Sequence, residues 1–400
     1  MSDTFSKPSN GFIVLMALLM SVTAMSIDAM LPALSLIASD LGADHANQQQ
    51  YIISCLFLGL AVGQLIAGPL SDALGRKPLL FACVLLYIAG SFACYVADSM
   101  TQLLLGRIVQ GLGAAGPIVS CVSIIRDRHA GRQMAQILSL VMMIFIMAPV
   151  LAPAFGQGLL YVASWRAIFL FYVVYAAAIM LWVHFSLPET LPPERRTPFR
   201  VSTLIHSTKL VLANRATLCY SLAMGCVFAG FIGYLSSTQQ IFQQQFEIGD
   251  AFVIYFGLQA LGFGVSSLLN SRWVETLGMR YLVLRALICM VALGALVAVI
   301  SLFFVLPFWC FFIFGLLSLF FVGLLFGNLN ALAMEPMGDI AGTATAIIST
   351  IANIVSLSIG TIIGQAYNLT LIPIAVGFFS TGIVAWLLVM MAERSRVASE

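Results

Sequence analysis

Long uninterrupted apolar runs dominate the chain, and charged residues fall mainly in the short segments between them. Two runs without any charged residue, 286–334 and 340–392, contain 49 and 53 residues. A transmembrane helix needs about 20 apolar residues, whereas a strand of a transmembrane barrel needs only about 9–11. Each run therefore predicts two membrane-spanning helices, joined by a turn at Pro307 in the first run and at 367–373 in the second.

The other apolar runs are also long enough to cross a membrane. Because a span must satisfy its backbone hydrogen bonds internally, each run is expected to form an α-helix. The predicted fold class is an all-α integral membrane protein with twelve transmembrane helices. The expected spans are 11–36, 48–71, 79–97, 101–125, 134–159, 166–187, 215–240, 251–271, 281–302, 308–333, 342–365 and 371–391.

Composition supports a membrane protein and gives little sign of other chemistry. Hydrophobic residues make up 61% of the chain and charged residues 8%, against about 25% charged residues in soluble domains. The eight cysteines fall inside expected spans at no metal-ligand spacing, so we expect no metal site. No motif suggests an enzyme. No phosphate-binding Gly-Lys-Ser loop is present, so we expect that transport is not powered directly by ATP. The net charge of +2 does not indicate a nucleic-acid partner.

The positions of the basic residues predict the orientation in the membrane. Lys and Arg collect on the cytoplasmic side of membrane proteins. Of the 18 basic residues, 16 lie at the two termini or in and beside the loops that follow the second, fourth, sixth and eighth spans, and all these segments are on one side of the membrane. The exceptions are Arg107, inside the fourth span, and Arg166, at the start of the sixth. Both termini are therefore expected to be cytoplasmic, and the first span, which carries Asp28, is too long for a cleavable signal peptide.

The chain is predicted to consist of two related halves. Residues 1–187 and 215–400 each hold six spans, and the Pro-rich, charged segment 188–214 reads as a cytoplasmic linker whose part 201–212 has the pattern of an amphipathic surface helix. Pseudo-symmetric halves of this kind are typical of transporters with a site at the repeat interface. Five positions match at a constant offset of 203, namely Gly59, Asp72, Leu74, Gly75 and Lys77 with Gly262, Glu275, Leu277, Gly278 and Arg280.

The loop after the second span carries a motif built from Gly68, Asp72, Gly75, Arg76 and Lys77. Gly68 permits close helix packing, Gly75 permits a tight turn, and Asp72 is placed to pair with Arg76 or to lie at a helix N-terminus. This spacing resembles the cytoplasmic signature of the major facilitator superfamily. The resemblance implies a latch between the two halves in the outward-open state. The alternative is that the two basic residues only set the topology.

Asp28 and Arg107 are charged residues inside expected spans, where charge is costly and usually functional. Arg107 begins the sequence Arg107-Ile-Val-Gln110-Gly111, which resembles a superfamily motif associated with proton coupling. Asp28 is predicted to lie a few residues before the end of the first span, at a depth similar to that of Arg107. A carboxylate there can load and release protons, and Arg107 can tune it or bind anions. The alternatives are a permanent Asp28–Arg107 ion pair, and an Arg107 bonded to backbone carbonyls of the first span.

The fifth span contains Pro149, Pro153 and Gly156, and two prolines four residues apart are expected to bend the helix. This sequence partly matches the antiporter motif of the superfamily. Together with Asp28-Ala-Met-Leu-Pro32, it is similar to drug:proton antiporters of the Bcr/CflA type. A packing kink without bearing on the direction of transport is the alternative.

The second half supplies no acid at membrane depth. Polar side chains there form a candidate substrate cavity together with aromatic and Met residues, which suits amphipathic ligands. These polar residues are Tyr234, Gln259, Asn328 and Asn353.

The resemblance therefore implies a proton-coupled antiporter that exports small amphipathic or drug-like molecules. It implies a monomer in the lipid bilayer of a bacterial inner membrane that needs no cofactor beyond the proton gradient. The alternatives are an exporter of a metabolite such as a siderophore, amino acid or peptide, a proton-coupled nutrient importer, and a sensor without transport activity.

Overall fold

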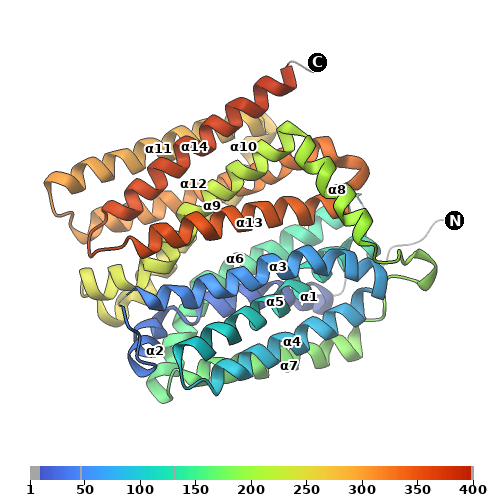
Figure 1. The fold of residues 1–400 in the computed structure, drawn as a ribbon, viewed down its shortest axis with the longest axis horizontal. Helices are drawn as coiled ribbons and strands as arrows, with labels where there is room; N and C mark the ends of the chain where they lie inside the picture. Colours follow the sequence, from blue (N-terminus) through green and yellow to red (C-terminus); the bar gives the residue numbers. More distant parts are fainter. Residues whose placement is uncertain (1–9, 46, 130, 398–400) are drawn as a thin grey trace. The chain divides into compact units, whose positions relative to one another are not determined.

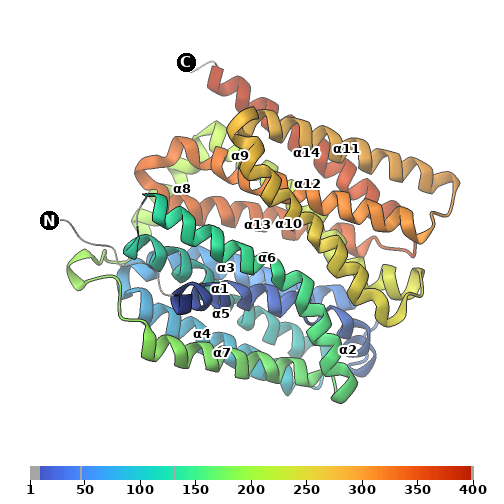
Figure 2. The ribbon, with the colours of Figure 1, turned by 180° about the vertical axis from the view of Figure 1, so that it is seen from behind.

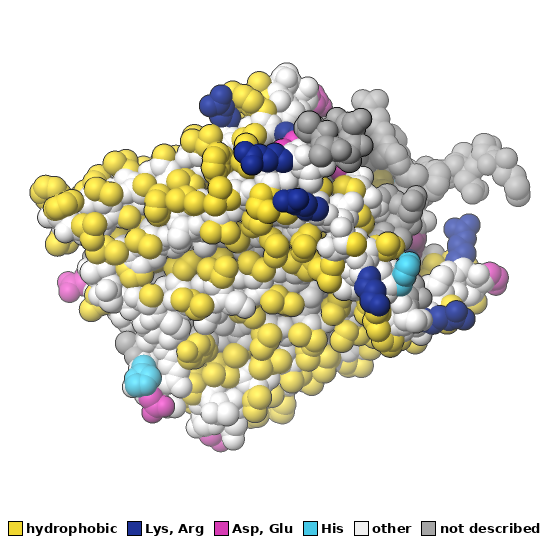
Figure 3. All heavy atoms as spheres, turned by 45° about the horizontal axis from the view of Figure 1, so that its top comes forward, with side chains coloured by type: hydrophobic (Ala, Val, Ile, Leu, Met, Phe, Trp, Pro, Cys, Tyr) yellow, Lys and Arg dark blue, Asp and Glu magenta, His cyan; other side chains and the backbone are white. Residues whose placement is uncertain are grey.

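The computed structural model describes residues 10–45, 47–129 and 131–397, and these residues are helical apart from short connections. Twelve helical segments are long and apolar enough to cross a membrane, which confirms the predicted number of spans. In the view of Figure 3, apolar side chains cover most of the visible surface, as expected for a multi-pass membrane protein.

Contacts divide the chain into two compact units. Unit 1 consists of residues 1–42 and 55–200, and unit 2 of residues 43–54 and 201–400. Unit 1 thus ends inside the segment 188–214 that was predicted to be a linker. The remainder of this segment forms a helix, α8 (Val201–Ala213), that belongs to unit 2.

In the described residues, unit 1 contains seven helices, of which α3 begins in residues that belong to unit 2. In unit 1, α4 packs against α5 and α7, and α1 packs against α5 and α6 (Figures 1 and 2). The helices are α1 (Asn10–Asp28), α2 (Leu34–Asp40), α3 (Tyr51–Leu74), α4 (Arg76–Tyr95), α5 (Met100–Arg128), α6 (Gly131–Val162) and α7 (Arg166–Ser186), with the short 3-10 turns η1 (Leu31–Ala33) and η3 (Pro193–Arg195).

In unit 2, α9 lies against α12, α13 and α14, and α10 packs against α12. The short helix α8 runs across the axes of the long helices of its unit (Figure 1). The helices are α9 (Arg215–Gln240), α10 (Phe252–Leu277), α11 (Met279–Phe303), α12 (Phe308–Met334), α13 (Ala341–Gln365) and α14 (Ile372–Val397), with the short segments η2 (Gln48–Gln50), η4 (Ile241–Gln245), η5 (Gly249–Ala251) and η6 (Glu335–Ile340).

The first span is a broken helix rather than a continuous one. α1 ends at Asp28, and the span continues through η1 and α2 to Asp40. Pro32 explains the break, because it has no N–H to bond the carbonyl of Asp28 four residues earlier and its ring clashes with that carbonyl. The helical segment continues for twelve residues after Asp28, four residues beyond the predicted end of the span at residue 36. The depth of Asp28 in the membrane stays a prediction.

The internal repeat is visible in two matched glycines. Gly75 precedes α4 with φ 107° and ψ 161°, and Gly278 precedes α11 with φ 78° and ψ 152°. Only glycine adopts such angles without strain. The offset of 203 residues found in the sequence therefore corresponds to the same turn in each unit.

Close helix packing repeats at the same offset. A Cβ on Gly59 of α3 would lie 2.1 Å from the Ile108 carbonyl oxygen of α5, and one on Gly262 of α10 would lie 2.6 Å from the Leu316 carbonyl oxygen of α12. Any larger side chain at either position would separate the two helices. The equivalent pairs α3–α5 and α10–α12 thus approach each other in the same way.

Candidate functional site

A closed ring of hydrogen bonds surrounds Arg107 in the interior of unit 1. Arg107 donates to the Gln110 side-chain oxygen at 2.6 Å and to the Ser26 carbonyl oxygen at 3.1 Å. Gln110 donates to the Ser91 hydroxyl at 2.8 Å, and Ser91 donates to the Tyr87 carbonyl at 2.8 Å. The Tyr87 hydroxyl forms a hydrogen bond with the Ser26 hydroxyl at 2.6 Å, which closes the ring. The ring connects α1, α4 and α5, and Arg107 is fully buried within it.

The break at Asp28 explains why donors gather here. The last four carbonyls of a helix have no partner within the helix. Arg107 supplies a donor to Ser26, and the Tyr172 hydroxyl of α7 donates to the Met25 carbonyl at 3.0 Å. A cation is also favoured near this negative end of α1. The geometry agrees with the alternative that Arg107 bonds backbone carbonyls of the first span.

Asp28 lies beside this ring but does not join it. Its side chain is 5% exposed, and no salt bridge links it to Arg107 in the part of the chain that the structure describes. The permanent ion pair that was one alternative is therefore not formed in this structure. A buried acid without an ion pair is an unusual and costly feature.

Gly156 brings the fifth transmembrane helix against the break. A Cβ at Gly156 would lie only 1.8 Å from the carbonyl oxygen of Ala29, the residue after Asp28. α6 continues through both Pro149 and Pro153 as one helix. Gly156 thus makes a close backbone contact with the first span, and the bend expected at Pro149 and Pro153 stays a prediction.

Gly111 likewise permits a close contact rather than contributing a polar group. A Cβ there would lie 2.1 Å from the Leu56 carbonyl oxygen of α3. Of the three residues predicted on this helix, Arg107 and Gln110 are therefore polar members of the ring, and Gly111 is a packing residue.

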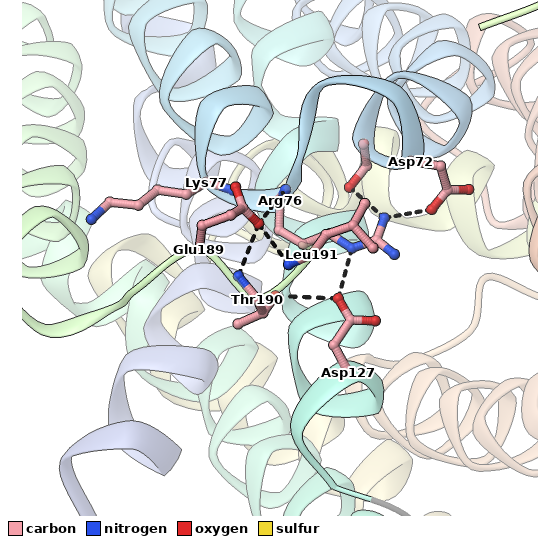
Figure 4. A network of polar contacts seen from close by, with 8 residues as sticks. Asp72, Arg76, Lys77, Asp127, Glu189, Thr190 and Leu191 are labelled. Carbon is pink, nitrogen blue, oxygen red and sulfur yellow. Dashed lines mark hydrogen bonds and ion pairs between the residues drawn. The ribbon is translucent and has the colours of Figure 1, made fainter. Parts of the chain in front are cut away.

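The predicted loop motif forms a network of charged groups at one end of unit 1 (Figure 4). Arg76 binds Asp72 at 2.5 Å, the Ser71 hydroxyl at 3.0 Å and Asp127, at the end of α5, at 2.8 Å. Lys77 donates to the carbonyls of His184 at 2.9 Å and Leu187 at 2.7 Å. Gly68 lies within α3 and is partly exposed.

Glu189 is a member of this network that the sequence did not reveal. Its carboxylate accepts hydrogen bonds from the backbone N–H groups of Arg76 at 3.0 Å and Lys77 at 3.1 Å, the first residues of α4. It also accepts from the N–H groups of Thr190 and Leu191, each at 2.9 Å (Figure 4). A carboxylate at a helix N-terminus is favourable for both charge and hydrogen bonding. Glu189 thus fixes the segment after α7 onto the start of α4.

Unit 2 carries a related charged cluster around Arg280, which matches Lys77 at the offset of 203. Arg280 binds Glu335 at 2.7 Å, just after α12, and Glu393, near the end of α14, at 3.2 Å. The Tyr220 hydroxyl of α9 also bonds to Glu393. In each unit, an acid at or just after the end of the fourth span and an acid near or after the end of the sixth span therefore bind to the start of the third span.

Among the contacts that the structure describes, two of the four residues predicted to line a substrate cavity bond to each other, and the cavity itself stays a prediction. The Tyr234 hydroxyl bonds to Gln259, which donates to the Phe312 carbonyl at 3.0 Å. Asn328 instead bonds to Asn270 at 2.7 Å, and Asn270 lies eleven residues beyond Gln259 on α10, about 16 Å along the helix. Asn353 is half-buried on α13. Tyr234 and Gln259 thus bond to each other, whereas Asn328 bonds to a different part of α10.

A cluster of uncharged amides in unit 2 was also missed. Gln50 donates to Gln240 at 2.7 Å, and Gln49 donates to Gln239 at 3.3 Å. Asn47 bonds to the carbonyls of Gln365 and Tyr367 at 3.0 and 2.8 Å, and Gln365 returns a bond to the Asn47 carbonyl at 2.8 Å. The run of three glutamines before Tyr51 was the available signal, since such polar residues are rarely buried without partners.

Comparison with known proteins agrees with the resemblance seen in the sequence. The family model described as Major Facilitator Superfamily matches residues 16–361. An uncharacterized MFS-type transporter of Bacillus subtilis, YdgK, is 29% identical over 96% of this chain and 95% of its own length. A bicyclomycin resistance protein homolog of Haemophilus influenzae is 26% identical over 88% of this chain and 89% of its own length.

The fold also matches solved structures. That of the proton:xylose symporter XylE bound to 6-bromo-6-deoxy-D-glucose has a TM-score of 0.74 at 12% identity, covering 95% of this chain and 94% of that one. At this identity the likeness shows the fold alone.

Proposed function

This chain belongs to the major facilitator superfamily, and we propose that within it the protein is a proton-coupled antiporter that exports small amphipathic or drug-like molecules by alternating access. The relative named as a bicyclomycin resistance protein homolog supports export of a drug-like substrate. The observation that carries the proposal of proton coupling is the burial of Asp28 inside a span without a salt bridge among the described residues.

Asp28 combines three properties that suit a coupling group. It is buried inside a span, it lies where the helix is broken, and no salt bridge neutralises it among the described residues. A buried carboxylate favours a state in which a proton or a cation neutralises it. We propose that Asp28 takes up a proton from outside and releases it inward when the substrate binds, so that proton and substrate compete for one group. Arg107 holds the end of α1 and thereby positions Asp28.

The proposal extends to the location and state of the protein. It places a monomer in the inner membrane of a bacterium with both termini in the cytoplasm, based on the distribution of Lys and Arg. It involves no cofactor and no enzymatic step, because the proton gradient supplies the energy. The network around Arg76 then lies on the cytoplasmic side, where the resemblance implies a latch.

The test is transport by the purified protein in proteoliposomes under an imposed pH gradient, with a panel of drug-like cations. Asp28→Asn is expected to abolish pH-driven transport, while Asp28→Glu retains part of it. Asp98→Asn is the matched control, since the Asp98 side chain is 89% exposed, and it should transport as the wild type does. Undiminished pH-driven transport by Asp28→Asn would refute the role of Asp28.

Direction and substrate are tested separately, because the same fold occurs in a proton:xylose symporter. In a cell whose interior is alkaline, a proton antiporter exports the substrate in exchange for protons that enter. A proton-coupled importer instead accumulates the substrate inside the cell. Drug susceptibility of a deletion strain, compared with metabolite profiling of its medium, distinguishes drug export from export of a siderophore, amino acid or peptide. Unchanged susceptibility together with a metabolite missing from the medium would favour the second function.

A further inference from the structure

The short helix α8 has three distinct faces along its length. At about 3.6 residues per turn, Leu204, Ser207 and Val211 fall within one sector of about 60°. Ser207 and Val211 are buried, and α8 contacts α9 and α13. This sector therefore attaches α8 to the rest of unit 2 and leaves the other two faces open.

The second face is an exposed apolar stripe. Val201, Ile205 and Leu212 fall within about 40° of one another around the helix. Their side chains are 58%, 50% and 47% exposed. Such a stripe on a helix that already has a buried face is not explained by packing within the chain.

The third face lies beside the stripe and is mainly polar. Ser202, His206, Lys209 and Ala213 occupy a sector of about 60°, and all four are exposed. Leu210, 42% exposed, lies just beyond this sector. A helix with one apolar and one polar open face is typical of segments that lie in a membrane surface.

The position and charge of α8 favour a lipid surface as its partner. α8 ends one residue before α9, whose span begins at Arg215, and it runs across the long helices (Figure 1). No acidic residue occurs between Glu194 and Glu247, whereas five basic residues do. Glu335 and Glu393, acids of unit 2 near the start of α9, are already bound to Arg280.

We propose that α8 lies in the plane of the membrane surface and binds anionic phospholipid headgroups. The stripe of Val201, Ile205 and Leu212 enters the boundary of the acyl chains. Lys209, with Arg200 and Arg215 at the two ends of the helix, binds the headgroup phosphates. This surface is independent of the transported substrate and of proton coupling.

Insertion of the stripe is tested by labelling neighbouring positions. The full-length protein is placed in nanodiscs of phosphatidylcholine mixed with phosphatidylglycerol and treated with a charged, membrane-impermeant maleimide. Ile205→Cys and Leu212→Cys are compared with the adjacent His206→Cys and Ala213→Cys, and the labelling of the wild-type protein is subtracted. The stripe positions are expected to react about tenfold more slowly than their neighbours, because the acyl boundary excludes the charged reagent.

Equal rates within both neighbouring pairs would overturn the proposal. In that case the stripe faces water, and a protein partner becomes the better explanation of its exposure. Slow labelling at all four positions would also contradict it, because α8 would then be wholly covered.

The headgroup contact is tested by lipid binding to the purified full-length protein, followed by native mass spectrometry. Lys209→Gln is expected to weaken binding of phosphatidylglycerol roughly fivefold, while Lys209→Arg retains it. Arg195→Gln is the matched control, since Arg195 is exposed but lies before α8, and it should bind as the wild type does. Binding that is equal for phosphatidylcholine and phosphatidylglycerol, or unchanged in Lys209→Gln, would refute anionic headgroup recognition.

Discussion

Arg107 donates a hydrogen bond to the carbonyl oxygen of Ser26 at 3.1 Å, two residues before Asp28, and forms no salt bridge with Asp28 among the described residues. Its charge therefore meets the end of a helix and the side-chain oxygen of Gln110. The sequence allowed Arg107 either to pair with Asp28 or to bond backbone carbonyls of the first span, and the structure shows the backbone contact. Arg107 bonds the end of the broken helix, and the binding of a proton or a substrate by the Asp28 carboxylate stays a proposal.

The first prediction follows from this arrangement. Removing one member of a buried ion pair costs about 3–5 kcal/mol, because the other charge is left uncompensated. The partners that the structure describes for Arg107 are neutral, so Arg107→Gln should lower the melting temperature by about the same amount whether residue 28 is Asp or Asn. A double-mutant cycle of melting temperatures is expected to give a coupling below about 1 kcal/mol. Recovery of stability in the double variant would instead demonstrate an ion pair.

A second prediction concerns the contact between α6 and the break in the first span. Gly156→Ala places a methyl group against the Ala29 carbonyl, and such overpacking costs about 1–3 kcal/mol or more. Gly158→Ala is the control on the same helix, since nothing lies within 4 Å of its Cβ position. Size-exclusion measurements after heating should show a lower melting temperature for Gly156→Ala and an equal or slightly higher one for Gly158→Ala. Equal stability of Gly156→Ala and the wild type would contradict this contact.

A third prediction concerns the carboxylate that caps α4. Glu189→Gln removes the charge and one acceptor oxygen, so the N–H groups of Arg76 and Lys77 lose a charge-assisted bond. The expected cost is about 1–2 kcal/mol of stability, with faster proteolysis of residues 188–200. Glu194→Gln, an exposed acid of the same segment, should leave both measurements unchanged. Similar proteolysis rates for the two variants would mean that Glu189 does not hold the segment.

The twelve spans were predictable because apolar length and charge are local properties of the sequence. The Asp72–Arg76 pair was predictable for the same reason, since its members lie four residues apart. Glu189 was not, because it meets Arg76 across 113 residues and only the packing of α7 on α4 brings them together. The roles predicted for Asp28 and Arg107 in proton coupling stay predictions.

The break in the first span shows how a local signal was misread. Pro32 follows Asp28 by four residues, which removes one helical bond, but the apolar run continues beyond it and suggests an unbroken span. The substrate cavity predicted in the second half rests on a different kind of signal and stays a prediction. Tyr234, Gln259 and Asn328 were grouped by their polarity, whereas their positions along α9, α10 and α12 decide which of them meet.

A fourth prediction uses the internal repeat as its own control. Gly75 and Gly278 adopt nearly the same backbone angles, so Gly75→Ala and Gly278→Ala should each cost about 1–3 kcal/mol of backbone strain. At Gly75 the new Cβ would also lie 2.6 Å from the Glu189 carboxylate, whereas nothing lies within 4 Å at Gly278. Gly75→Ala is therefore expected to show the larger fall in melting temperature.

The excess at Gly75 should depend on Glu189 if the added contact causes it. In a Glu189→Ala background the carboxylate is gone, and the remaining close neighbour is the flexible tip of the Arg196 side chain at 3.1 Å, which can shift at little cost. Gly75→Ala and Gly278→Ala are therefore expected to lower the melting temperature by similar amounts. Melting temperatures of the four variants and their backgrounds, measured in one detergent, complete the comparison. A difference that persists without Glu189 would locate the extra cost in the turn itself, and equal effects in the wild-type background would show that the carboxylate moves aside without loss.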